Sequence, residues 1–202
     1  MLIGIDLDHT IIDYGDAFYS LALERGLINS QFRGTKTELR EHLRLQPEGH
    51  EQWMRLQGYV YGKGMNYAKI MPGFIHFIQL CRHNKIKTVI VSHKTEYGHY
   101  DPDKIDLRKA ALKWMEVNGF FDATLSFNKN DIFFELTQEE KIARITALGC
   151  TLFIDDLIDI FIRDDFPQSV KTYLLNKEKN QNHHGKIEHC LVWDEVTQKI
   201  FP

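Results

Sequence analysis

The chain has 202 residues, of which 43% are apolar and 26% charged, and its net charge is −3. This length fits one domain, or a domain with an insertion, and the composition is globular rather than disordered or coiled-coil. No basic excess points to nucleic acid or to an anionic membrane, and no apolar run reaches the roughly 18 residues of a membrane span. A small phosphorylated substrate remains compatible with this charge, because local cations can bind it.

Short apolar runs, rich in β-branched residues, predict strands that are buried on both faces of a parallel sheet. The clearest runs are residues 2–5, 88–91 and 151–154, with 170–175 as a fourth candidate and 123–127 and 190–193 as weaker ones. The pattern therefore predicts a parallel sheet as the centre of the fold.

Helical patterns lie between these strands, at residues 74–81, 107–117 and 138–148. The last begins with a capping box, in which Thr137 is the N-cap and Glu140 follows three residues later. Strands that alternate with helices predict a layered α/β fold with right-handed crossovers.

Residues 14–71 do not follow this alternation. They contain helical patterns at 18–25, 37–45 and 51–60 and no convincing strand. The stretch is much longer than a usual crossover, so it is interpreted as a helical insertion over the edge of the sheet. The expected division is an α/β core domain of residues 1–13 and 72–202 and a helical domain of residues 14–71.

Polar side chains follow the strand candidates, where open α/β sheets bind their ligands. Asp6 and Asp8 follow the first strand, and Asp155 and Asp156 follow the third. Acids placed together repel one another unless a cation lies among them, and oxygen ligands beside a phosphate suit Mg²⁺. One carboxylate could attack phosphorus while another transfers a proton, and the hydroxyl of Ser92 could bind a phosphoryl oxygen.

Three segments together resemble the haloacid dehalogenase-like phosphohydrolases. The segment Asp6-Leu7-Asp8-His9-Thr10 resembles the DxDxT motif of that family. Residues 71–73 and 86–92 resemble the approach to its second motif, and residues 153–159 resemble its acidic fourth motif. The resemblance covers the chain from Met1 to about Leu175.

The resemblance implies a Rossmann-like core with a small helical cap inserted after the first motif. It also implies an aspartyl-phosphate intermediate on Asp6, with Asp8 as general acid and base and Thr10 and Ser92 at the phosphate. Mg²⁺ would be held by Asp6, by the backbone carbonyl of Asp8 and by an acid of the fourth motif. Asp155 with Asp156 fits one family spacing, and Asp155 with Asp159 fits another.

The phosphate-site lysine of the family corresponds best to Lys141, at the start of the helix before the third strand. Lys129 and Lys94 remain alternatives. The presence of Asp8 favours phosphoryl transfer, because dehalogenase members of the family lack the second aspartate.

These features predict a Mg²⁺-dependent phosphatase that acts on a small phosphorylated metabolite. There are two alternatives. One is a phosphomutase or phosphotransferase, and the other is a binding or regulatory protein without turnover. Three scattered cysteines and an N-terminus without a secretory pattern predict a cytoplasmic protein without nucleic-acid or membrane partners. The substrate, the oligomeric state and the role of residues 176–202 are not predicted.

Overall fold

The computed structural model describes residues 1–176 and 187–201, and the chain divides into two compact units. The sheet unit contains Met1–Ile12, Ile70–Lys94 and Gly119–Pro202, and the helical unit contains Asp13–Lys69 and Thr95–Asn118. None of the described helices is long and apolar enough to cross a membrane.

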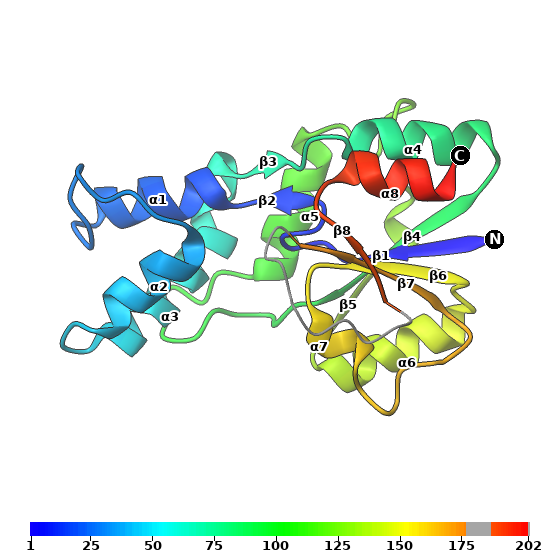
Figure 1. Ribbon diagram of the computed structural model, residues 1–202. Helices are drawn as coiled ribbons and strands as arrows, with labels where there is room; N and C mark the ends of the chain where they lie inside the picture. Colours follow the sequence, from blue (N-terminus) through cyan, green and yellow to red (C-terminus); the bar gives the residue numbers. More distant parts are fainter. Residues whose placement is uncertain (177–186, 202) are drawn as a thin grey trace. The chain divides into compact units, whose positions relative to one another are not determined.

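Within the described residues, the sheet unit contains a parallel sheet of six strands in the order β5-β4-β1-β6-β7-β8 (Figure 1). The strands are β1 (Leu2–Ile5), β4 (Lys87–His93), β5 (Ile132–Glu135), β6 (Leu152–Asp155), β7 (Lys171–Leu175) and β8 (Ile187–Cys190). The central strands β1 and β6 are almost fully buried, which explains their continuous apolar sequence. The predicted Rossmann-like α/β class is confirmed.

Helices cover both faces of this sheet (Figure 1). One face carries α4 (Phe74–His83) and α8 (Trp193–Ile200), and the other carries α6 (Gln138–Leu148) and α7 (Ile158–Phe161); η2 (Lys129–Asp131) precedes β5. The α6 face buries a cluster that includes Ile142, Phe153 and Leu174. A Cβ at Gly4 would lie 2.5 Å from the Phe153 ring, so β1 and β6 require a glycine where they pair.

The helical unit is built from α1 (Gly15–Glu24), α2 (Lys36–Arg44), α3 (Gly49–Tyr61), η1 (Lys63–Tyr67) and α5 (Leu107–Val117). The Thr35 hydroxyl caps α2, and the Thr35 backbone N–H donates a hydrogen bond to the Glu38 carboxylate, which completes a capping box. Phe18 of α1 stacks on Trp53 of α3 with the ring centroids 5.2 Å apart. Two short strands, β2 (Ile12–Asp13) and β3 (Lys69–Ile70), form a separate two-stranded sheet.

The helical unit is larger than the insertion expected from the sequence, because it also includes residues 95–118. The Trp114 indole N–H of α5 donates a hydrogen bond of 3.1 Å to the Ala68 carbonyl. Lys63 forms an ion pair of 2.5 Å with Asp103. These contacts join segments that are distant in the sequence, which explains why periodicity alone assigned residues 95–118 to the core.

The two weaker strand predictions are wrong, one entirely and one in most of its residues. Residues 123–127 form no strand, and the edge of the sheet is β5 instead. Phe127 stacks on Phe74 and Phe120, with ring centroids 6.5 and 5.7 Å away, so the apolar pattern there reflects core packing. The candidate at 190–193 overlaps only the last residue of β8, and α8 begins at Trp193.

Candidate active site

Three neighbouring strands of the sheet unit, β4, β1 and β6, bring the candidate site residues to one edge. Asp6 follows β1, Ser92 lies near the end of β4, and Asp155 is the last residue of β6. The Asp6 backbone N–H donates a hydrogen bond of 2.9 Å to the Ile154 carbonyl, which fixes Asp6 beside β6. Parallel pairing therefore brings together residues that are almost 150 positions apart.

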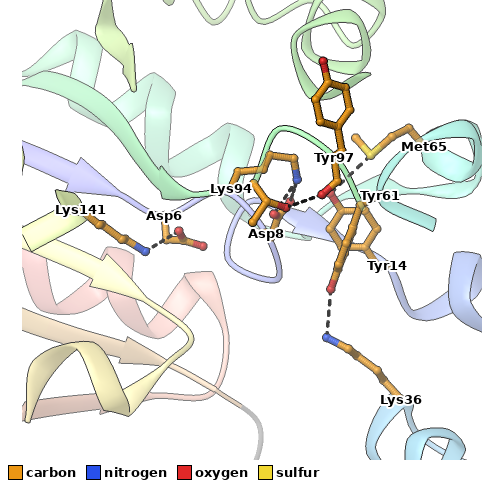
Figure 2. Close-up of polar contacts among 10 residues, drawn as sticks. Asp6, Asp8, Tyr14, Lys36, Tyr61, Met65, Lys94, Tyr97 and Lys141 are labelled. Atoms are coloured by element: carbon orange, nitrogen blue, oxygen red, sulfur yellow. Dashed lines mark hydrogen bonds and ion pairs between the residues drawn. The ribbon is translucent and has the colours of Figure 1, made fainter. Parts of the chain in front are cut away.

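Lys141 links the two acids at the centre of this edge. Its Nζ lies 2.6 Å from an Asp6 carboxylate oxygen and 2.7 Å from an Asp155 oxygen, and Figure 2 shows the Asp6 contact. The lysine extends from the first turn of α6, whose start is fixed by a hydrogen bond from the Glu140 N–H to the Thr137 hydroxyl. All three charged groups are buried, with exposures of 5% or less.

Burial changes the protonation of this group of residues. It raises the pKa of Asp6 to about 7; the Lys141 ammonium opposes this rise, and the negative charge of Asp155 adds to it. Burial alone would lower the pKa of Lys141, but the carboxylates of Asp155 and Asp6 outweigh it and raise the pKa. Lys141 therefore stays an ammonium group beside both acids.

The acids form a set that could hold a metal ion. One oxygen from each of Asp6, Asp155 and Asp156 lies within 4.8 Å of the others. The carboxyl groups of Asp6 and Asp155 share the single ammonium group of Lys141, and Asp156 adds a third acid to the set. An all-oxygen donor set of this kind fits Mg²⁺. The donor chemistry of these residues therefore fits the implied metal.

The loop after β1 carries Asp8 beside a second buried lysine. Lys94 Nζ lies 2.7 and 3.0 Å from the two carboxylate oxygens of Asp8 (Figure 2). His9, with a φ of 64°, turns the chain between Asp8 and Thr10, and its N–H donates a hydrogen bond to the Ile12 carbonyl. The chain therefore turns directly after β1, and Asp8 lies in this turn.

Two hydroxyl groups in the site are buried and have no hydrogen-bond partner among the residues that the structure describes. They are Ser92 Oγ and Thr10 Oγ1, on residues that are 1% and 0% exposed. The Thr10 backbone is fixed separately, because its carbonyl accepts a hydrogen bond of 2.9 Å from the Trp193 indole N–H. An unsatisfied buried hydroxyl is costly and calls for an explanation, and a bound anion such as phosphate would supply the missing acceptors.

The residues that the sequence left as alternatives lie in different surroundings in the structure. Among the described residues, the possible metal ligands include Asp156 and not Asp159, which is exposed on α7. Lys129 is also exposed, and its ammonium lies 5.0 Å above the Phe121 ring. Lys141 is the alternative that reaches Asp6. The contact between Lys94 and Asp8 was not predicted. The sequence carried one signal for it: Lys94 lies two residues after Ser92, and in an extended chain two such side chains point to the same side.

Comparison with known proteins places this geometry in a known fold. No family model and no curated protein sequence matches the chain. A haloacid dehalogenase-like hydrolase from Streptococcus pneumoniae is similar in structure, with a TM-score of 0.63 and 11% identity over 98% of this chain and 97% of that one. The putative HAD-hydrolase YfnB from Bacillus subtilis, bound to magnesium, has a TM-score of 0.60 and 14% identity over 100% and 98% of the chains.

Protein tyrosine kinase A from Mycobacterium tuberculosis is equally similar, with a TM-score of 0.60 and 14% identity over 100% of this chain and 98% of that one. At such low identity these likenesses establish the fold alone. The chain has the α/β fold of the haloacid dehalogenase-like hydrolases, which was the family that its motifs resembled. The same fold also occurs in a kinase, so the reaction must be argued from the site.

Proposed function

We propose that this protein is a Mg²⁺-dependent phosphatase that hydrolyses a small phosphorylated metabolite. The observation that carries the proposal is the buried contact of Lys141 with both Asp6 and Asp155, together with the buried hydroxyls of Ser92 and Thr10, which have no partner within the described part of the chain. Carboxylate, ammonium and hydroxyl groups at one sheet edge are the set that phosphoryl transfer requires.

In the proposed reaction, an Asp6 oxygen attacks phosphorus and the bond from phosphorus to the leaving oxygen breaks. Asp8 gives its proton to that oxygen, so the product leaves as an alcohol. Water then attacks the phosphorus of the aspartyl-phosphate while Asp8 takes a proton from the water. The bond between phosphorus and the Asp6 oxygen breaks, which restores the Asp6 carboxylate and releases inorganic phosphate. Each half-reaction moves one proton through Asp8, which ends the cycle in its starting state.

The other groups stabilise charge during these steps. Lys141 and the hydroxyls of Ser92 and Thr10 would contact the phosphoryl oxygens as negative charge develops. Mg²⁺, held by the Asp6, Asp155 and Asp156 carboxylates and the Asp8 backbone carbonyl, would supply the charge that lets a phosphate dianion approach Asp6. The structurally similar B. subtilis protein is bound to magnesium, which supports this choice of metal.

The helical unit, inserted in the chain after Asp6 and Asp8, is proposed to act as the cap that selects the substrate. We also propose that the protein works in a reducing cytoplasm, because its three cysteines are free. Neither nucleic acid nor a membrane is proposed as a partner.

The test is a screen of phosphate esters with and without Mg²⁺, followed by the Asp6→Asn variant. We expect release of inorganic phosphate that depends on Mg²⁺. In Asp6→Asn, turnover of p-nitrophenyl phosphate should fall by at least about a thousandfold, the scale of loss when a nucleophile is removed. The exposed residue Asp159 provides a matched control, and Asp159→Asn should keep full turnover.

Other outcomes would identify the alternatives. Full turnover in folded Asp6→Asn would remove Asp6 as the nucleophile. Transfer of phosphate to a second alcohol, without release of inorganic phosphate, would indicate a mutase or phosphotransferase; the kinase of similar fold makes this the second candidate. No reaction with any ester in the presence of Mg²⁺ would favour a binding or regulatory role.

A further inference from the structure

Lys94 contacts Asp8, and the proposed reaction as described above assigns Lys94 no role. Its ammonium nitrogen lies 2.7 Å from one Asp8 oxygen and 3.0 Å from the other. The Lys94 side chain is 2% exposed, and that of Asp8 is 19% exposed. Lys94 therefore provides a buried anchor for an aspartate that stays partly open to solvent.

The backbone holds this anchor in place. Lys94 directly follows β4, and its N–H donates a hydrogen bond of 2.9 Å to the Glu135 carbonyl at the end of β5. On the other side of the contact, Asp8 belongs to the tight loop that His9 turns. Both partners are thus attached to ordered backbone, and the contact fixes the remaining freedom of the Asp8 side chain.

The two buried lysines contact different acids, which indicates different roles. Lys141 contacts Asp6 and Asp155, next to the group that attacks phosphorus. Lys94 contacts Asp8, the group that transfers protons in the proposed reaction. Because its ammonium reaches both oxygens, one oxygen can carry the transferred proton while the other keeps the contact with Lys94.

We propose that Lys94 is a positioning residue, which holds the Asp8 carboxyl group in the orientation that proton transfer to and from the reacting oxygens requires. The inference rests on the proposed function, since it assigns Lys94 a role through Asp8. Proton transfer demands hydrogen-bond distance and alignment, and a carboxyl group that rotates freely about its side-chain bonds meets that demand only part of the time.

The test compares two substrates of similar shape, p-nitrophenyl phosphate and phenyl phosphate. p-Nitrophenolate leaves readily without a proton, whereas phenolate is a poorer leaving group and depends more on a general acid. The value of kcat/KM reports the first chemical step, in which the leaving group departs. We expect Lys94→Met to lower kcat/KM about 100-fold for phenyl phosphate, a typical contribution of positioned proton transfer, and less than about tenfold for p-nitrophenyl phosphate.

Two further variants separate positioning from a structural role. Asp8→Asn should likewise lower kcat/KM more for phenyl phosphate than for p-nitrophenyl phosphate. In the double variant with Lys94→Met, the ratio of the two kcat/KM values should change little further, because both substitutions act through the Asp8 carboxyl group. Lys94→Arg retains the positive charge and should recover part of the phenyl phosphate activity. If Lys94→Met does not fold, as judged by its melting transition, the comparison is made with Lys94→Arg and Lys94→Gln.

Equal losses for both substrates would overturn the proposal and make Lys94 a phosphate-binding residue. Unchanged kinetics in folded Lys94→Met would overturn it as well. In both cases the unmodified protein still hydrolyses the two esters, so the proposed phosphatase function stands. If the unmodified protein hydrolyses neither ester, nor any other in the screen, the proposed function and this inference fall together.

Discussion

At the scale of single residues, Lys94 and Lys141 contact three of the acidic side chains of the site. Lys141 binds Asp6 and Asp155, and Lys94 binds Asp8. A buried ammonium group is costly unless it is paired and hydrogen-bonded. The sheet unit has two of them at one edge, and buried, paired charges of this kind are typical of functional sites.

The cysteines give a prediction at the same scale. Cys81, Cys150 and Cys190 are free and buried, and burial raises their pKa values to about 12, 11 and 11 respectively. The thiolate is the reactive form, so at pH 8 the native protein should react with a chromogenic disulfide reagent at least about 100-fold more slowly than an ordinary thiol of pKa about 8.5.

The measurement is the time course of thiol release, with glutathione as the reference thiol. In guanidinium chloride all three cysteines should react at the reference rate. Fast reaction of the native protein would contradict the burial of these side chains and, with it, the packing of the sheet unit.

Part of this arrangement of site residues could be predicted from the sequence. Asp6 and Asp155 could be placed together because each follows a strand of one predicted parallel sheet. Lys141, Lys129 and Lys94 could not be separated with certainty, because the reach of a long side chain depends on its direction in space. The contact between Lys94 and Asp8 is a tertiary feature of this kind, formed across 86 positions of the chain.

At the scale of elements, the segment between β4 and α5 is held by a close contact with α3. A Cβ placed on Gly98 would lie 2.6 Å from the Gly58 Cα, which is closer than real Cβ contacts allow. The segment is also closed on itself, because the Leu107 N–H donates a hydrogen bond of 2.8 Å to the Glu96 carbonyl. The two glycines thus let the loop backbone and the helix backbone pack directly.

We therefore expect Gly98→Ala to destabilise the protein by about 1–3 kcal/mol, the usual cost of overpacking a close contact. Gly15→Ala is the matched control. Its added Cβ would meet one side-chain oxygen of Asp13 at 3.2 Å, and alanine suits the start of α1. Denaturant unfolding measures both variants, and equal stability of Gly98→Ala and Gly15→Ala would contradict the packing of this loop on α3.

The regular elements were predictable where hydrophobic periodicity was strong. The runs that became β1, β4, β6 and β7 and the patterns that became α4 and α6 are close to their predicted bounds. The edge strand β5 was missed, because its apolar run is only three residues long, Ile132 to Phe134, and its residues are only half-buried. Helix α8 was not predicted, and the weak strand pattern at residues 190–193 overlaps its first residue.

At the scale of the whole molecule, the sequence predicted an insertion but not its full extent. Residues 14–71 stood out because they break the alternation of strands and helices. Residues 95–118 belong to the same helical unit, yet α5 has the ordinary pattern of a crossover helix. Its packing against α3 and η1 depends on long-range contacts, such as that of Trp114 with Ala68, which local periodicity does not contain.

The central claim is that Asp6, Asp155 and Asp156 bind a divalent cation, and calorimetric titration of Mg²⁺ into metal-free protein tests it most directly. We predict one saturable site in the unmodified protein and in the exposed control Asp159→Asn. Asp156→Asn removes one candidate ligand without touching the contacts of Lys141, and it should weaken binding at least about tenfold, the smallest loss typical of changes at a metal site. No binding by the unmodified protein, or equal affinity in Asp156→Asn, would contradict the account.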